Sequence, residues 1–391
     1  MTKCCELELA ITLLSQGNSK DKSKIIIRQL FSFFMNTFNN TKKLISDFQL
    51  KVSDYKIGWF DSFNPLCQCE KNAVKLLAIE NGAHMCYLLR GTYNCKQEIQ
   101  ELMNHPVYYY YKIPKKKGGY REICAPSENI KTIQRILNYY LQGYYLCIKP
   151  QEVFGFVINS RFYKNKANIV ANAQSHVGKK CVLNIDLKDF FPSISARRIY
   201  QLFSSELFNY NQNLATAFTL LTTFQGRLPT GAPTSPVLSN FICLEMDQML
   251  INFALQNKIT YTRYADDLTF SSDENITQDC ISQIISIINK NDFEINPKKL
   301  RLMGTTSKQT VTGLVVNRKV NIDRVQFKRI RAVVYDINKN GVSLAYQKYI
   351  QKNKHIRLRS EDHFLSHIKG WVSYINHVKE YEVHALKINI N

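Results

Sequence analysis

The chain has 391 residues, with 52 Lys or Arg against 31 Asp or Glu and a formal net charge of +21. This excess of basic residues is typical of proteins that bind nucleic acid or an anionic membrane surface. No apolar run approaches the roughly 18 residues that cross a bilayer, and no signal peptide opens the chain, so nucleic acid is the favoured partner. The eleven cysteines fit neither a disulfide framework nor a zinc site, which indicates reduced thiols in a cytoplasmic protein.

Residues 1–104 are predicted to form an N-terminal helical extension. Apolar residues recur at helical spacing in 25–38 and in 73–89, and a Gly- and Pro-bounded loop at 58–65 lies between them. The extension could dock a partner or enlarge the domain that follows, and the sequence leaves both possibilities open.

A strand pair follows at 108–113 and 120–124, and its turn carries three consecutive lysines, Lys115 to Lys117. A basic turn is either a solvated hairpin tip or a cover for phosphate oxygens. Arg121 on the returning strand favours the second, because a guanidinium binds phosphate oxygens bidentately. After Pro126, apolar residues at helical spacing predict an amphipathic helix.

An acid interrupts the buried strand predicted from Cys181 towards Pro192. Alternation places Cys181, Leu183, Ile185 and Leu187 on one face, and Asp186 on the other with Val182, Asn184 and Lys188. A buried carboxylate needs a cation, which is either a nearby Lys or Arg or a metal ion.

The tetrapeptide Tyr264-Ala265-Asp266-Asp267 lies at the bend of a second predicted hairpin, between β-branched and aromatic flanks. Adjacent Asp residues at a bend are either a solvated turn or a seat for a hard divalent cation. Together with Asp186, Asp266 and Asp267 would supply three carboxylates from two strands, a set that can hold two Mg²⁺ ions.

With these motifs in order, the chain resembles the reverse transcriptases, and among them the bacterial retron reverse transcriptases, over roughly residues 105 to 385. The matching segments are Ile113–Ile123, Asp186–Phe191, Leu228–Pro236 and Tyr264–Asp267. Two further matches are specific to retrons: Asn172-Ala-Gln-Ser-His176, which fits Asn-Ala-x-x-His, and Val311-Thr312-Gly313.

The resemblance implies a role for individual residues. It makes Asp186, Asp266 and Asp267 the catalytic metal ligands. It implies that a set of fingers and palm residues binds the incoming nucleotide: Lys115, Lys116, Arg121, Phe191, Thr230, Gly231 and Lys299. It also implies RNA contacts from the two retron motifs, through Asn172, His176, Val311, Thr312 and Gly313.

Several of these residues have a structural alternative. Phe190 and Phe191 could both be core residues, whereas the resemblance makes Phe191 the ring that excludes a ribose 2′-hydroxyl. Lys299, the implied general acid near pyrophosphate, could be a solvated lysine, and His176 a core histidine. Similar enzymes carry Gln where Thr230 stands, a departure that touches no metal ligand.

The implied fold is α+β, a right-hand polymerase with an antiparallel palm sheet packed on helices, mixed fingers and a helical thumb. We expect an N-terminal helical extension at 1–104, fingers including the Asn-Ala-x-x-His segment at 105–180, a palm at 181–322 and a thumb at 323–391. Within the palm, residues 237–255 are expected to form one helix, and 311–316 with 320–322 a hairpin. The thumb sequence is basic with interleaved tyrosines, which suits a phosphate backbone.

The implied function is RNA-directed DNA synthesis on a cognate structured noncoding RNA, giving a branched RNA-linked DNA (msDNA). The implied partners are this RNA, its DNA product, dNTPs and an effector protein encoded nearby, in antiphage defence and without a membrane. One alternative is a group II intron-like reverse transcriptase with maturase activity, which predicts a DNA-binding or nuclease extension after the thumb, and none follows in this sequence. The other is an RNA-binding scaffold with a vestigial site, which predicts a lost carboxylate, whereas all three are present.

Overall fold

The computed structural model describes residues 68–92, 95–115, 118–158, 167–353, 356 and 358–379. The first part contains α5 (Gln68–Leu77), α6 (Gly82–Arg90), α7 (Lys96–Asn104), β1 (Tyr108–Pro114), β2 (Tyr120–Pro126), α8 (Glu128–Ile148) and α9 (Ile169–Gln174). The middle contains β3 (Cys181–Asp186), α10 (Phe190–Ser193), α11 (Ala196–Ser204), α12 (Gln212–Thr222), α13 (Ser235–Ile242), α14 (Leu244–Gln256), β4 (Thr260–Tyr264), β5 (Asp267–Ser272) and α15 (Gln278–Lys290). The last part contains a 3₁₀ helix (Pro297–Lys299), β6 (Arg301–Gly304), β7 (Thr310–Val311), β8 (Leu314–Val315), α16 (Arg324–Asn340), α17 (Val342–Lys352) and α18 (Glu361–Val378). The helix predicted at 25–38 and the loop at 58–65 lie outside the described residues.

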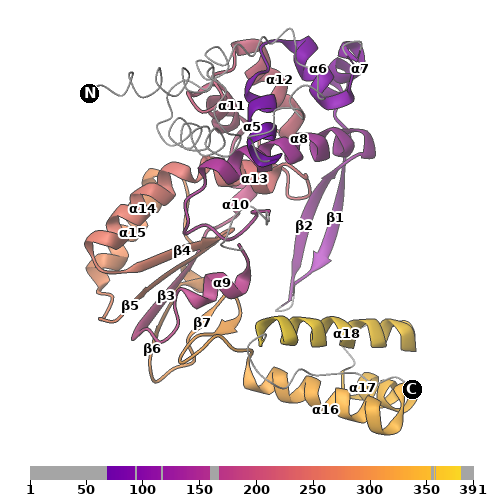
Figure 1. Cartoon of the computed structure of the whole chain (residues 1–391), viewed down its shortest axis with the longest axis vertical. Helices are drawn as coiled ribbons and strands as arrows, with labels where there is room; N and C mark the ends of the chain where they lie inside the picture. Colours follow the sequence, from indigo (N-terminus) through magenta and orange to yellow (C-terminus); the bar gives the residue numbers. More distant parts are fainter. Residues whose placement is uncertain are drawn as a thin grey trace, which may run out of the picture.

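A four-stranded antiparallel sheet with the strand order β4-β5-β3-β6 lies below α13, on the left side of the view in Figure 1. The side chains of β3 alternate as predicted: Cys181, Leu183 and Ile185 join one hydrophobic core, and Val182 joins a second, smaller one. Helices α14 and α15 lie side by side against this sheet (Figure 1). Asp186 ends β3 on the same face as Val182, as alternation requires.

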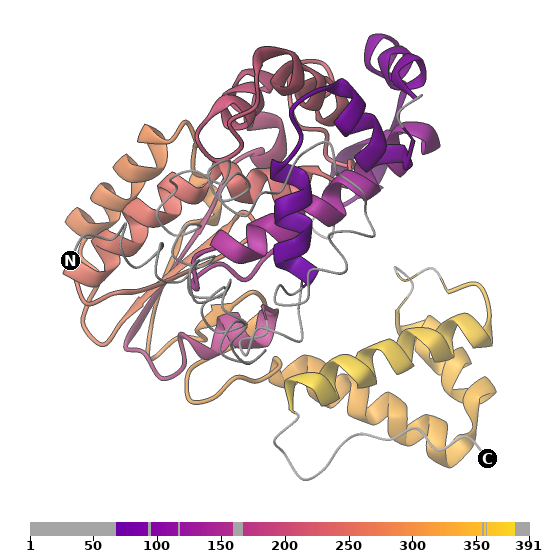
Figure 2. The same ribbon diagram turned by 45° about the horizontal axis from the view of Figure 1, so that its top comes forward.

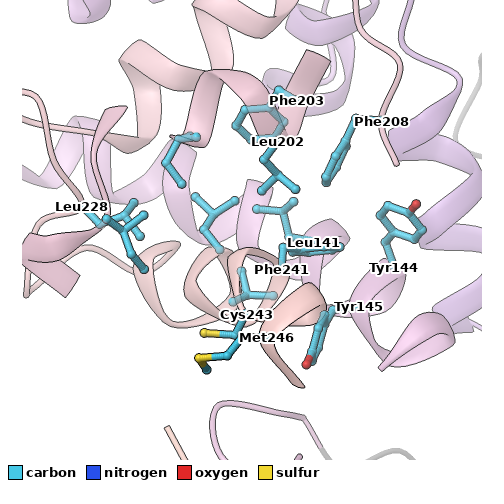
Figure 3. Packing of buried hydrophobic residues seen from close by; sticks show 14 of the residues in the cluster. Leu141, Tyr144, Tyr145, Leu202, Phe203, Phe208, Leu228, Phe241, Cys243 and Met246 are labelled. Carbon is cyan, nitrogen blue, oxygen red and sulfur yellow. The ribbon is translucent and has the colours of Figure 1, made fainter. Parts of the chain in front are cut away.

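Aromatic rings dominate the larger core beside the sheet. The Phe208 ring is surrounded by Tyr144, Phe203 and Phe241, with ring centroids 5.3, 5.0 and 5.3 Å away (Figure 3). Burying each such ring stabilises the fold by roughly 1.5–3 kcal/mol. This packing joins α8 to α11 and α13, and it makes a rigid support for the loop that precedes α13.

The strands β1 and β2 form an antiparallel hairpin that projects away from this core (Figures 1 and 2). Its base is held by Tyr108, which stacks on Phe224 at 4.2 Å between ring centroids and accepts a hydrogen bond from Gln134 Nε2. Beyond the base, Tyr109 and Tyr111 are about half exposed. Both strands lie where the sequence predicts them.

Helices α16–α18 pack on one another as a group set apart from the sheet (Figure 2). Their buried faces share the smaller core with residues of β7, β8 and α9, including Val311, Leu314 and Ala173. The helical character predicted after residue 323 is confirmed for the described residues.

The structure corrects three predicted elements. The single helix expected at 237–255 is two helices, α13 and α14, that meet at Cys243. The apolar stretch 73–89 is also divided, because Asn81 caps a new helix by accepting a hydrogen bond from His84 N. Residues 311–316 are not one strand, because Thr312 and Gly313 both have positive φ (47° and 84°) and turn the chain between β7 and β8. The predicted pairing with 320–322 is found at one position, where Val315 and Asn321 exchange backbone hydrogen bonds.

Two structural features are absent among the residues that the structure describes. No helix there is both long and apolar enough to traverse a bilayer. No disulfide joins the cysteines of these ranges.

Candidate active site

Three carboxylates converge where β3 ends and β5 begins. Asp186 is paired directly with Asp267 in the antiparallel register, a position in which Cα atoms lie about 4.5–5.5 Å apart. Asp266 occupies the short β4–β5 loop, and its carbonyl accepts a hydrogen bond from Leu187 N at 3.0 Å. The structure therefore brings the three predicted Asp residues together.

The cluster carries more negative charge than its surroundings neutralise. Asp186 is 7% exposed. Burial raises the pKa of Asp266, and the charge of Asp186 raises it further. Burial among protein atoms, followed by the charges of Asp266 and Asp186, raises the pKa of Asp267 to about 6, although this residue keeps an exposed edge. Raised pKa values in a carboxylate cluster are typical of a site that binds cations.

Lys299 provides one cation. Its Nζ lies 2.6 Å from Asp186 Oδ1, and the lysine side chain remains 55% exposed. The 3₁₀ helix that carries it is tied to β3 by a hydrogen bond from Asn296 N to Asp186 O at 2.8 Å. The alternative in which Asp186 pairs with a lysine is thus realised, and the lysine is one that the resemblance assigns to the same site.

A divalent cation such as Mg²⁺ needs several oxygen ligands placed around one point. Among the residues that the structure describes, no three His, Cys, Asp or Glu side chains are placed so that they would ligate one ion without adjustment. Carboxylate oxygens are nevertheless the ligands that Mg²⁺ prefers. Burial raises the pKa of Asp266 and Asp267, and the charge of Asp186 raises both further, a repulsion that a bound cation would relieve. The three side chains fit a divalent cation on chemical grounds.

Arg121 and Lys115 lie on the β1–β2 hairpin. Arg121 is exposed, and its positive charge partly offsets the rise that burial causes in the pKa of Asp266. Lys115 is also exposed, and its backbone N–H bonds to Gly119 O across the turn. Lys116 lies outside the described residues.

The loop before α13 is bonded to β2 through Thr230 and Gly231. Thr230 Oγ1 accepts a hydrogen bond from Cys124 N at 2.8 Å and donates one to Glu122 O at 3.2 Å. Gly231 N donates to Cys124 O at 2.9 Å, and a Cβ on Gly231 would lie 2.9 Å from that same oxygen. Thr230 therefore joins the loop to the hairpin, a role that the comparison with Gln did not suggest.

Phe190 and Phe191 differ in burial, so they are not both core residues. They begin the short helix α10, which turns the two rings in different directions. Phe190 is buried at 6% exposure. Phe191 is partly exposed and stacks on Phe156, with ring centroids 5.6 Å apart.

The retron motifs do not form an exposed RNA surface, which corrects the sequence-based prediction for three of their side chains. Asn172 and His176 are 1% and 0% exposed. His176 Nδ1 and Nε2 hydrogen-bond to the hydroxyls of Ser271 and Thr262 at 2.6 and 2.7 Å. Val311 is buried as well. In this fold these side chains contact protein.

Thr312 and Gly313 remain accessible at the β7–β8 turn, so their predicted RNA contacts stay predictions. Thr312 Oγ1 donates to Ile169 O of α9 at 3.5 Å. The two motifs, about 140 residues apart in the chain, therefore meet in one unit between the sheet and α16.

Three functional candidates were not predicted: Gly155, Asp247 and Arg263. Arg263 is fully buried directly before Tyr264 and pairs with Asp247 of α14. A charged residue within an apolar strand was the available signal for Arg263. Gly155 had no signal, because the need for glycine arises from the neighbouring backbone of Tyr264 and Ala265.

Comparison with known proteins shows which protein family this chain matches. Residues 113–316 match the family described as "Reverse transcriptase (RNA-dependent DNA polymerase)". A solved telomerase structure from Candida albicans has a TM-score of 0.41 at 13% identity, over 73% of this chain and 63% of that one. That structural likeness is too weak to carry a conclusion, whereas the family match includes the three Asp residues.

Similar proteins of known identity place the chain more narrowly within this family. The chain is 33% identical over 272 residues to the Retron Ec86 reverse transcriptase of Escherichia coli, across 68% of this chain and 75% of that protein. It is 30% identical over 339 residues to the Retron Mx65 reverse transcriptase of Myxococcus xanthus, across 82% and 73%. The chain therefore belongs to the reverse transcriptase family, among the retron reverse transcriptases of bacteria. It is an RNA-directed DNA polymerase with an RNA template and dNTP substrates, and enzymes of this family use divalent metal ions.

Proposed function

We propose that this reverse transcriptase copies part of a cognate structured noncoding RNA into DNA that stays joined to that RNA. Synthesis starts from a 2′-hydroxyl of the RNA, so the product is a branched msDNA. The complex acts in the bacterial cytoplasm in antiphage defence, where it restrains an effector protein encoded nearby. The observation that carries the polymerase part is the pairing of Asp186 with Asp267 beside Asp266.

Asp186, Asp266 and Asp267 would hold two Mg²⁺ ions. When bound, the ions activate the attacking hydroxyl and stabilise the leaving oxygen. The exposed side chains of Arg121 and Lys115 neutralise triphosphate oxygens from the hairpin side, together with Lys116. Lys299 approaches from the 3₁₀ helix that precedes β6, and its exposed ammonium can pass from Asp186 to a phosphate oxygen.

Phe191 selects the sugar of the incoming nucleotide. Its ring stacks on Phe156 and is thereby fixed next to the end of β3. A fixed ring under the ribose would exclude a 2′-hydroxyl by steric clash, which favours deoxynucleotides. Thr230 and Gly231 keep the nucleotide-binding loop against β2.

The described elements fall into fingers, a palm and a thumb, preceded by a helical extension. The hairpin β1–β2 belongs to fingers at 105–180, the four-stranded sheet to a palm at 181–322, and α16–α18 to a thumb at 323–391. Residues 68–104, within the extension at 1–104, pack through α5 on α8. Thr312 and Gly313 are left as accessible RNA-contacting positions at the palm–thumb junction.

The test is to purify the full-length protein from its host, with the DNA that surrounds its gene, and to sequence the attached nucleic acid. We expect a short DNA joined to one structured transcript through a linkage that a 2′–5′ debranching enzyme cleaves. The variant Asp266→Ala with Asp267→Ala should retain the transcript and lack the DNA. Heterogeneous cellular RNA without attached DNA would contradict the retron function and favour a maturase or a scaffold.

A further inference from the structure

A buried ion pair lies directly behind the carboxylate cluster. Arg263 donates from Nε to Asp247 Oδ1 at 2.8 Å and from Nη2 to Asp247 Oδ2 at 2.6 Å, and both side chains are 0% exposed. Tyr261 OH donates to the same carboxylate at 2.8 Å. Burying such a pair costs several kcal/mol of desolvation per ion, and apolar residues of similar volume often serve stability equally well. Stability alone therefore gives little reason for an arginine here.

The remaining donor of the guanidinium points to the catalytic turn. Arg263 Nη1 lies 2.8 Å from Asn240 Oδ1 and 3.2 Å from the carbonyl oxygen of Ala265. Ala265 has a φ of 60°, a conformation that costs a residue with a Cβ roughly 1 kcal/mol or more. The hydrogen bond from Arg263 holds the carbonyl that precedes Asp266 in this strained turn.

Gly155 supports the turn from the adjacent segment. A Cβ at Gly155 would lie 2.2 Å from Ala265 N, so only glycine fits against this backbone. Asn240 Nδ2 donates to Gly155 O at 3.0 Å. Asn240 thus joins the segment behind the turn to the guanidinium that holds the turn.

We propose that Arg263, oriented by Asp247 and Asn240, is a positioning residue that fixes the Ala265 turn and thereby the placement of the Asp266 and Asp267 carboxylates. This inference rests on the proposed catalytic role of those two residues. Displacing a catalytic group by about 1 Å can cost a hundredfold in rate. The arginine would then act on the chemical step without touching RNA or dNTP.

The geometry separates this role from general stability. Asp247 already binds two donors of the fork, which satisfies the ion pair. A lysine at position 263 would keep the charge and reach Asp247, but one ammonium cannot also bind Asn240 and Ala265 with the fork geometry. Arg263→Lys therefore weakens the contact with the turn more than it weakens the charge balance.

The test measures single-nucleotide incorporation of dTTP on an RNA template with a DNA primer, using full-length Arg263→Lys. We expect kcat to fall at least about tenfold, with KM for dTTP within about twofold of wild type. Mn²⁺ binding, followed by electron paramagnetic resonance without substrate, should weaken as well. Tyr210→Phe, which removes a buried hydroxyl bonded to Leu76 O in the aromatic core, is the stability control and should leave both readouts unchanged.

An unchanged kcat in folded Arg263→Lys would overturn the inference, as would an equal loss in Tyr210→Phe. If Arg263→Lys does not fold, Asn240→Ala decides the question, because it leaves the pair with Asp247 in place and should give the same pattern. Asp266→Ala with Asp267→Ala is measured in parallel. DNA synthesis by that double variant would refute the catalytic assignment, whereas its inactivity beside a fully active Arg263→Lys would refute the positioning role alone.

Discussion

Lys299 is the lysine that contacts the carboxylate cluster. Its Nζ binds Asp186 Oδ1 at 2.6 Å, yet the side chain is 55% exposed and free to turn towards solvent. An ammonium in this position can neutralise charge on a leaving pyrophosphate or donate a proton to it. We therefore propose a catalytic use for this lysine as well as an electrostatic one.

We predict that Lys299→Ala lowers the rate of nucleotide incorporation about a hundredfold, the lower end of the usual range for a lost general acid. Lys298→Ala is the matched control, because Lys298 is exposed in the same 3₁₀ helix. Single-turnover kinetics with both variants would decide. Equal rates for the two variants would show that Lys299 has no special role.

His176 is held neutral inside the protein. Burial, followed by the charge of Lys179, lowers its pKa from 6.5 to about 3. Its two ring nitrogens bind the Ser271 and Thr262 hydroxyls, which can each donate or accept. Below pH 6.5 the unfolded chain binds a proton that the folded chain excludes until about pH 3, so the stabilising contribution of His176 declines through that window.

The non-titrating variant His176→Gln should therefore lose less stability on acidification than wild type. The difference in the free energy of unfolding between the two proteins should shrink by about 2 kcal/mol from pH 7 to pH 5. Urea unfolding at the two pH values measures it. A difference that stays constant would mean that His176 does not titrate in the unfolded chain as expected.

Individual site residues were predictable from the sequence where a local pattern carries the chemistry. Asp186 was identifiable as an acid in an apolar strand, and Asp266 with Asp267 as acids at a hairpin bend. The partners of His176 and Arg263 were not identifiable, because they come from elements up to 95 residues away. A single sequence gives no register between such elements.

At the scale of elements, the contact between β2 and the loop before α13 sets the position of the hairpin over the site. Thr230 Oγ1 accepts a hydrogen bond from Cys124 N and donates one to Glu122 O. Both backbone groups lie on β2, within three residues after Arg121. Losing these bonds would leave a partly buried backbone N–H unpaired, at a cost of about 1–3 kcal/mol. The arginine on β2 would lose its fixed distance from the carboxylates.

We predict that Thr230→Val raises KM for dNTP at least about fivefold with a smaller change in kcat. Thr230→Ser keeps the hydroxyl and should stay close to wild type. Steady-state kinetics on an RNA template measures both. If Thr230→Val and Thr230→Ser have the same KM, the hydroxyl does not support nucleotide binding.

The secondary structure was predicted best for a long amphipathic helix and for the hairpin whose bend carries two acidic residues. Both hairpin strands around Asp266 and the long helix α8 lie where expected. The turn at Thr312 was missed, because a β-branched residue with a φ of 47° is rare and no pattern marks it. The break at Cys243 was missed because apolar residues continue through it.

For the whole molecule, β3 links two hydrophobic cores, one behind the carboxylates and one shared with α16–α18. Three exposed basic residues, Arg324, Lys328 and Arg331, follow one face of α16 at helical spacing. With a net charge of +21, the protein should bind RNA in a strongly salt-dependent manner.

Replacing Arg324, Lys328 and Arg331 with Gln should reduce the slope of log affinity against log salt by about 2, as expected for three lost phosphate contacts on single-stranded RNA. Lys258→Gln with Lys290→Gln, which changes exposed lysines near the ends of α14 and α15, should leave the slope unchanged. Filter binding over a salt series measures it. An unchanged slope in the α16 variant would exclude that face from RNA binding.

We propose that Asp186 belongs to one catalytic site with Asp266 and Asp267. The most direct measurement compares DNA synthesis on an RNA template by Asp186→Asn and Asp189→Asn, because Asp189 is an exposed acid three positions further along the chain. We predict that Asp186→Asn falls below about 1% of the wild-type rate, the scale expected for losing a catalytic metal ligand, while it still binds RNA. Asp189→Asn should remain active. Wild-type synthesis by Asp186→Asn would contradict the account.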